Sequence, residues 1–237
     1  VTSNTFRSLN VNAPVDGERP DPQLERITEV RSTGKETDRG FDLGLRLRAE
    51  ERRMFAFARY RYSREMNAAD DALGLPADSY DLAAEWGPSA NDIRHRIFGH
   101  VSVGLPLKLG LNMSARVDSP SPYTIRTGFD DNGDTVTNDR PAGVGRNSER
   151  GAWQRSADLR LSWRSDDGPP ARRGRRGDDD DDDGERRRGI EMYIDVQNVF
   201  NTTNFTSYSG VMTSPYFRLP TAAGSGRRME LGTRVFF

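Results

Sequence analysis

The sequence predicts an all-β protein, an antiparallel transmembrane β-barrel segment of about seven or eight strands. Three observations support this prediction. Apolar and polar residues alternate over most of the chain, the connections alternate between short and long, and residues 228–237 form an alternating strand that ends on an aromatic residue. Alternation with a period of two is typical of strands with one apolar face. No run approaches the ~18 apolar residues of a membrane helix, but barrel strands present only half of their residues to lipid.

Composition excludes several classes of function. The chain has 237 residues with 35 basic and 36 acidic side chains, so no excess charge points to a nucleic-acid partner. It has no cysteine, hence no disulfide or thiolate metal site. Its two histidines, His95 and His100, fall on opposite faces of one predicted strand, so a two-histidine metal site is not expected. No serine, histidine and aspartate set stands in a hydrolase motif, and we expect no enzyme activity and no catalytic residue.

The first third of the chain is interpreted as a loop followed by a hairpin. Residues 1–24 contain three prolines and Asn and Asp turn residues, which predict an outer loop. Residues 27–49 alternate on both sides of a Ser-Thr-Gly segment, and this pattern fits either two strands or one long bulged strand. The tight turn at 49–52 leads into a strand over 54–62, which completes a hairpin. The start lacks a signal-peptide pattern, so we interpret the chain as mature or as part of a longer protein.

The remaining two thirds repeat this arrangement with longer connections. The segments expected in order are a long polar connection (63–91), a strand (97–105), a short turn (105–107), a strand (107–117), a long loop (119–151), a strand (153–163), a charged low-complexity insertion expected to be disordered (165–189), a strand (190–196) and the closing strand (228–237). If the closing strand ends on the periplasmic side, both short turns lie there and both long loops lie outside, as in transmembrane barrels.

Aromatic residues favour a membrane barrel over a soluble one. Trp153 and Trp163 lie ten residues apart on one face, and at ~3.3 Å per residue with a ~40° tilt this spacing spans ~25 Å, the height of a lipid-facing apolar band. Tyr60 and Tyr62 fall at the predicted outer end of their strand, where an aromatic belt is expected. A soluble ligand-binding barrel, with its apolar face turned inward, is the alternative for the alternation alone.

An ordered series of short motifs resembles the C-terminal barrel of Oar-like TonB-dependent outer-membrane receptors. The matching segments are Arg19-Pro20-Asp21-Pro22, Glu29 to Gly34, Ser79-Tyr80-Asp81-Leu82, Glu85-Trp86-Gly87, Asp92 to Arg96, Asp131 to Asp134, Asn138 to Pro141, Asn198 to Asn201, Asn204-Phe205 and Gly226 to Phe237. The resemblance implies a barrel of about 22 strands, filled by a plug and energised through a TonB box, neither of which is visible in the sequence.

We therefore interpret residues 1–237 as the C-terminal part of one outer-membrane β-barrel domain. The implied function is energised uptake or sensing of a bulky ligand across the cell outer membrane. Outer-membrane lipid and the barrel-assembly machinery are the implied partners, whereas the TonB system and the plug would act only through the missing N-terminal part. Under this resemblance, residues 27–49 form a single long strand. The alternative is a self-contained eight-stranded barrel with a structural or adhesive role.

The closing strand carries a candidate assembly signal. It has a polar residue, a glycine two positions later, and then apolar and aromatic residues, and this order resembles the terminal signal of outer-membrane barrels. The residues assigned to the signal are Glu230, Gly232, Val235 and Phe237.

One loop carries a candidate metal site. Asp130, Asn132 and Asp134 place oxygen ligands at positions 1, 3 and 5 of a calcium-loop-like run. The position where such loops have an acidic residue is occupied by Pro141, with Asp139 nearby. The alternative is a turn rich in Asp and Asn with no metal. Calcium is thus the one cofactor that the sequence suggests.

Overall fold

The computed structural model describes residues 2–165 and 189–236, and within these ranges the chain consists of strands and loops. None of the described residues belongs to a helix that is long and apolar enough to cross a membrane. The strands are β1 (Thr2–Asn10), β2 (Thr28–Ala49), β3 (Met54–Asn67), β4 (Gly87–Pro88), β5 (His95–Leu105), β6 (Leu109–Asp118), β7 (Pro122–Tyr123), β8 (Glu149–Arg150), β9 (Gln154–Arg164), β10 (Gly189–Gln197), β11 (Phe205–Tyr208), β12 (Pro220–Ala223) and β13 (Arg228–Phe236).

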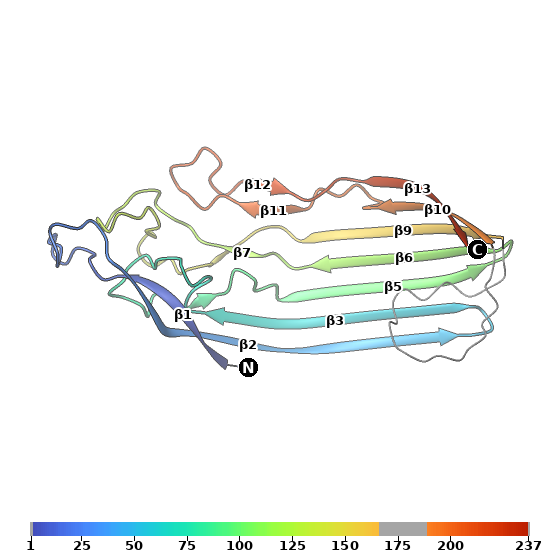
Figure 1. Cartoon of the computed structure of the whole chain (residues 1–237), viewed down its shortest axis with the longest axis horizontal. Helices are drawn as coiled ribbons and strands as arrows, with labels where there is room; N and C mark the ends of the chain where they lie inside the picture. The colour runs from blue at the N-terminus through green and yellow to red at the C-terminus, as the bar shows by residue number, and fades with distance from the viewer. Residues whose placement is uncertain (1, 166–188, 237) are drawn as a thin grey trace.

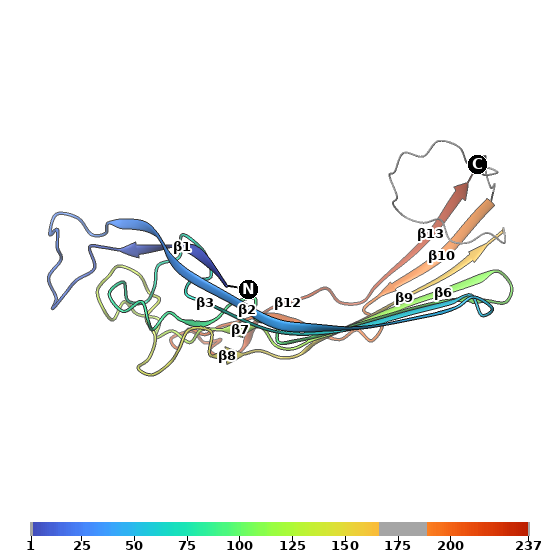
Figure 2. The same ribbon diagram turned by 90° about the horizontal axis from the view of Figure 1, so that it is seen from below.

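The long strands form one antiparallel sheet that follows the order of the chain. Its path is β1-β2-β3-β5-β6-β9-β10-β13, with the short β4 added to β3. The strands run along the long axis of the molecule in Figure 1, and Figure 2 shows the sheet curving toward β13. β1 and β13 are its edges and do not pair with each other among the described residues. The predicted antiparallel barrel segment is confirmed, as an open, barrel-like wall.

The prediction that residues 1–24 form a loop is wrong for its first part, because Thr2–Asn10 form β1. The three prolines all follow Asn10, so they mark only the later residues as a turn-rich loop. Ser8 Oγ donates a hydrogen bond to the Ala72 carbonyl (2.7 Å), and the Asn10 amide donates to Ser79 Oγ (2.9 Å). These distant partners, together with the ladder to β2, stabilise a strand that local alternation does not predict.

Residues 28–49 form one strand of 22 residues, so the single-strand interpretation is confirmed. β1 pairs with Thr28–Thr37, β3 pairs with Glu36–Ala49, and the β1–β2 register shifts once between Thr5 and Arg7. Gly40 lies inside β2, where β2 and β3 approach closely. A Cβ there would lie 2.2 Å from the Tyr62 carbonyl oxygen, so the glycine permits pairing rather than breaking the strand.

Short and long connections lie at opposite ends of the sheet, as predicted. The β2–β3 and β5–β6 turns lie at the end where β13 finishes, and the long loops gather at the other end (Figure 1). β6 begins at Leu109 because Leu107 and Lys108 adopt positive φ angles (59° and 62°) that complete the turn. The predicted charged insertion at 165–189 lies outside the described residues except for its two ends.

The long loops pack into an outer region that is separate from the sheet. It contains the two small ribbons β7–β8 and β11–β12. Among the described residues, the few fully buried apolar side chains lie in β1 and in these loops, and the long strands from β2 onward have none; the buried set comprises Leu9, Ala13, Ala68, Ala77 and Ile125. The long strands are therefore not organised around a conventional core.

Candidate functional site

One face of the sheet is a continuous apolar surface, which we call the apolar face. The pairing register places alternate residues of β2, β3, β5, β6, β9, β10 and β13 on this face. Its large exposed side chains are Phe41, Leu43, Leu45, Leu47, Ile97, Val101, Leu105, Met113, Trp163, Ile190, Met192, Ile194, Met229, Leu231 and Val235. Soluble monomers rarely expose so many contiguous apolar side chains. This surface has the chemistry of one that contacts hydrocarbon.

An aromatic cluster ends the apolar face on the side of the long loops. Phe41, Tyr60, Tyr62, His95 and Trp153 form it, with ring centroids of neighbouring members 5.4–6.1 Å apart. The Tyr60 hydroxyl and His95 Nδ1 are hydrogen-bonded at 2.9 Å. Amphipathic rings at this height are typical of a membrane interface. β3 continues five residues past Tyr62 to Asn67, so the prediction that Tyr60 and Tyr62 lie at the outer end of their strand is wrong, although both border the apolar face on the side of the long loops.

The opposite face, which we call the polar face, is held together by ion pairs. The carboxylate of Glu191 is nearly buried and lies 3.4 Å from Arg164, 3.4 Å from Arg234 and 3.8 Å from Arg160. Arg160 also pairs with Asp195 at 3.0 Å. Charged groups that are shielded in this way contribute more than exposed pairs, because water screens them less.

The candidate assembly signal is divided between the two faces. Val235 is on the apolar face, whereas Glu230 and Gly232 are on the polar face opposite Asp195 and Tyr193. A Cβ on Gly232 would lie 2.2 Å from the Tyr193 ring, so the ring covers the glycine closely. Phe237 lies outside the described residues. Recognition by assembly machinery stays a prediction.

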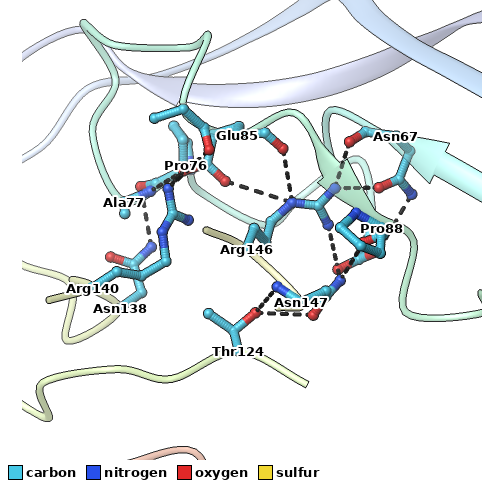
Figure 3. A network of polar contacts seen from close by, with 12 residues as sticks. Asn67, Pro76, Ala77, Glu85, Pro88, Thr124, Asn138, Arg140, Arg146 and Asn147 are labelled. Atoms are coloured by element: carbon cyan, nitrogen blue, oxygen red, sulfur yellow. Dashed lines mark hydrogen bonds and ion pairs between the residues drawn. The ribbon is translucent and has the colours of Figure 1, made fainter. Parts of the chain in front are cut away.

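A cluster of buried polar groups joins two of the outer loops, and we call it the outer-loop polar cluster (Figure 3). Its centre is Arg146, whose Nε donates to the Glu85 carbonyl (2.9 Å) and whose Nη2 donates to the Asn67 carbonyl (2.6 Å). Nη1 lies 2.6 Å from an Asp70 carboxylate oxygen, and the Glu85 carboxylate is 3.8 Å from Nε. Arg140 adds a 2.8 Å pair to Glu85. Two guanidinium groups thus neutralise two carboxylates inside the loops.

Hydrogen bonds and charge lower the pKa of Asp70 in this cluster. Burial alone would raise the pKa, but the Ala90 N–H, the Arg146 guanidinium and the Asn147 amide together outweigh it. Asn147 Nδ2 donates to Asp70 at 2.8 Å, and the Ala90 amide donates at 2.7 Å. The carboxylate is therefore kept ionised by specific partners.

The outer-loop polar cluster borders a cavity of about 430 Å³. Tyr123 and Tyr208, stacked with their ring centroids 5.5 Å apart, line one side, and Arg126, Arg140 and Arg146 line another. The lining of the cavity therefore combines aromatic and basic side chains. Sequence reasoning did not single out Arg146 or Asp70, because they are separated by most of two long loops and carry no spacing signal.

The predicted calcium ligands do come together in one turn of the β7–β8 connection. Asp130 accepts the amides of Asp134 and Thr135, and Asn132 Oδ1 also accepts the Asp134 amide, each at 2.9 Å. These bonds also fit the alternative, a turn rich in Asp and Asn. No group of three or more His, Cys, Asp or Glu side chains in residues 2–165 and 189–236 is arranged to hold a metal ion. Calcium binding stays a prediction.

Comparison with known proteins identifies the type of fold. No family model matches the sequence, and no curated protein matches it. Among solved structures, the chain is similar to the outer membrane transporter YddB from Escherichia coli, with a TM-score of 0.60 and 12% identity. The similarity covers the whole of this chain and 30% of the transporter's chain. The protein therefore has the fold of a segment of an outer-membrane transporter barrel.

Proposed function

We propose that the chain is the C-terminal part of the barrel of a TonB-dependent outer-membrane receptor of the Oar-like type. The complete receptor would take up or sense a bulky ligand, with energy delivered through a plug and the TonB system that belong to the rest of the protein. This chain contributes wall and outer loops and performs no catalysis. Its direct partners are outer-membrane lipid and the barrel-assembly machinery.

The apolar face is the main observation that supports this proposal. It continues over seven neighbouring strands, is bounded by aromatic side chains, and is opposed by a polar face rich in ion pairs. A soluble barrel would turn its apolar side chains inward, whereas a membrane barrel turns them outward and keeps a polar lumen. In the proposed placement the polar face lines the lumen, and the outer loops face the exterior.

The absence of cysteine permits a direct test of orientation. Leu73 is 80% exposed in the outer loop after β3, and Arg52 is exposed in the short β2–β3 turn at the other end. In intact cells, a membrane-impermeant maleimide is expected to label Leu73→Cys, and to label Arg52→Cys only after the outer membrane is permeabilised. Equal labelling of both variants in intact cells, or recovery of the chain in the soluble fraction, would contradict the proposal.

The pairing of the edge strands distinguishes a segment of a receptor barrel from a self-contained barrel. Among the described residues, β1 pairs with Thr28–Thr37 of β2 and does not close onto β13. We therefore expect the isolated chain in detergent to lack the heat-modifiable, protease-resistant migration of a closed barrel. A compact heat-modifiable monomer would instead favour the small structural or adhesive barrel.

A further inference from the structure

The loop over residues 130–139, which we call the acidic loop, is the meeting point of three outer segments. Asn132 Nδ2 donates to the Ala77 carbonyl (2.7 Å), and Asn138 Nδ2 donates to the Leu75 carbonyl (2.9 Å). From the first outer loop and its strand, Arg19 Nη2 donates to the Gly133 carbonyl (2.5 Å) and Asn10 Nδ2 to the Asp134 carbonyl (3.0 Å). The position of the acidic loop therefore sets the arrangement of its neighbours.

Backbone bonds orient the oxygens of the acidic loop without using all of their lone pairs. The Asp130 carboxylate accepts two amides, Asn132 Oδ1 accepts one, and Asp134 Oδ1 accepts the Val136 amide at 2.8 Å. Each carboxylate oxygen has two lone pairs. Gly133 and Thr135 adopt positive φ angles of 70° and 77°, so the chain curls around this group. Asp130 and Asn132 are both exposed residues.

Two other oxygens of the same loop are buried and accept no hydrogen bond. Asp134 is fully buried, and its Oδ2 has no hydrogen-bond partner among the described residues. Asn138 Oδ1 is likewise enclosed without a partner there. An enclosed carboxylate oxygen without a partner is costly, and native proteins normally satisfy such atoms with a donor or a cation. This observation is independent of the spacing of the acidic residues.

The acidic loop also has an excess of negative charge. The carboxylates of Asp130, Asp131, Asp134 and Asp139 all lie within these ten residues. Arg19 reaches the loop through a hydrogen bond to the Gly133 carbonyl and not through a carboxylate. A bound cation would offset this negative charge.

We propose that the acidic loop binds one calcium ion through side-chain oxygens of Asp130, Asn132, Asp134 and Asn138. These residues occupy positions 1, 3, 5 and 9 of the run, and all supply the hard oxygen ligands that calcium takes in flexible geometry. Magnesium demands nearly ideal octahedral geometry and loses its water reluctantly, so it fits this set less well. The ion would fix the acidic loop and, through it, the segments at Leu75–Ala77 and Asn10–Arg19. This proposal does not depend on the transport function.

Calcium titration of the full chain in detergent micelles tests the proposal. Because the sequence also contains six consecutive aspartates, the titration is made in a background in which Asp178–Asp183 are replaced by serine. Since Pro141 supplies no ligand at position 12, we expect one site with a dissociation constant on the order of 0.1–1 mM, the range of extracellular modules. Magnesium is expected to bind at least tenfold more weakly.

Matched variants identify the ligands. Asp134→Asn and Asp130→Asn are expected to weaken calcium binding at least tenfold, because each removes a charge while keeping the shape of the side chain. Asp71→Asn is the control, since Asp71 caps an exposed turn in the neighbouring loop through the Leu73 amide (2.8 Å). Unchanged affinity in Asp134→Asn, no binding in the serine background, or equal weakening by Asp71→Asn would overturn the proposal.

Hydrogen exchange in the chain with the acidic loop unaltered provides a test that needs no ligand substitution. Amides of residues 131–136 are expected to exchange at least fivefold more slowly in calcium than in a chelator, whereas amides of β6 remain unchanged. Equal exchange in the two conditions would overturn the proposal even if the variants fail to fold.

Discussion

The long sheet and the outer loops are stabilised in opposite ways. In the sheet, large apolar side chains are exposed on one face and charged side chains pair on the other. In the outer loops and the adjoining β1, the largest fully buried side chains among the described residues are all polar, namely Ser8 and Asn10 of β1 and Asn12, Ser89, Asp92 and Asp134 of the loops. The sheet thus relies on its surroundings to accept its apolar face, whereas the loops depend on internal hydrogen bonds. We expect each region to be sensitive to a different kind of substitution.

The largest effect is expected when the outer-loop polar cluster loses its central guanidinium. Arg146→Met would remove the donor to the Glu85 and Asn67 carbonyls and the 2.6 Å pair to Asp70, and each buried group left without its partner typically costs about 1–3 kcal/mol. Hydrogen exchange should show this as lost protection in residues 66–92, with β9 and β10 unaffected. Arg31→Met is the control, because the Arg31–Glu29 pair is exposed on both sides and its loss should have no measurable effect. Retained protection in Arg146→Met would contradict the stabilising role of the cluster.

A charge at the centre of the apolar face should have the next largest effect. Met113 is on this face and Ser114 is on the polar face of the same strand. In a bilayer, Met113→Arg is expected to destabilise the receptor by about 2–4 kcal/mol, the cost of an arginine at the midplane of a barrel wall. Ser114→Arg, which lies opposite Asp158 in the register, should cost far less. Equal shifts in the urea midpoints of the two variants would show that this face does not contact lipid.

A smaller effect is expected where the two last strands are in close contact. Gly232→Ala would place a Cβ against the Tyr193 ring, which Arg160 covers at 3.8 Å, and displacing such a packed ring costs about 1 kcal/mol. Gly44→Ala is the matched control, since its added Cβ meets nothing within 4 Å. Tyr193→Ala should make Gly232→Ala nearly neutral in a double-mutant cycle. If the destabilisation by Tyr193→Ala and that by Gly232→Ala are additive, the contact between these two residues is not the cause of the effect.

The smallest expected effect is a loss of outer-loop stability at low pH. The pKa of Asp70 is lowered in the folded protein, so its contribution is complete above the unfolded value of about 4 and is lost as the pH falls through the folded pKa. Asp134 and Asp139 have raised pKa values and act in the opposite direction, favouring the folded loops at low pH. The outer-loop amides of Asp70→Asn should therefore lose less protection below pH 4 than those of the unaltered chain. The measurement is hydrogen exchange corrected for intrinsic rates. If Asp70→Asn loses the same protection below pH 4 as the unaltered chain, Asp70 is not the cause of that loss.

The sheet was largely predictable from the sequence because alternation is a local signal. In β5 and β9, each residue's side follows from its parity, and the pairing with the neighbouring strands keeps this pattern across the sheet. The predicted faces of Tyr60, Trp163 and Gly232 follow from this rule. The seven long strands from β2 to β13 and the short turns were predictable for the same reason, whereas β1 was missed.

The outer region was not predictable, because its order depends on partners far away in the sequence. β1 lacks alternation and is stabilised by contacts to Ala72 and Ser79. Arg146 lies 79 residues from Asn67, and no spacing rule connects them. Asp130, Asn132 and Asp134 could be recognised only because their spacing is local, and even there the unpartnered oxygens became visible only in the folded loop.

In the proposed membrane placement, the length of β2 determines how far the outer-loop polar cluster lies from the membrane surface. Asn67 pairs with Glu36, five residues beyond Phe41 in the aromatic cluster, which is roughly 13 Å along the axis of a tilted strand. The Debye length at physiological ionic strength is about 8 Å, so headgroup charges are largely screened at that height. In the proposed placement, changes in lipid composition should leave the ionisation of Asp70 unchanged. The ion pair between Asp70 and Arg146 would therefore keep its strength whichever lipids surround the barrel.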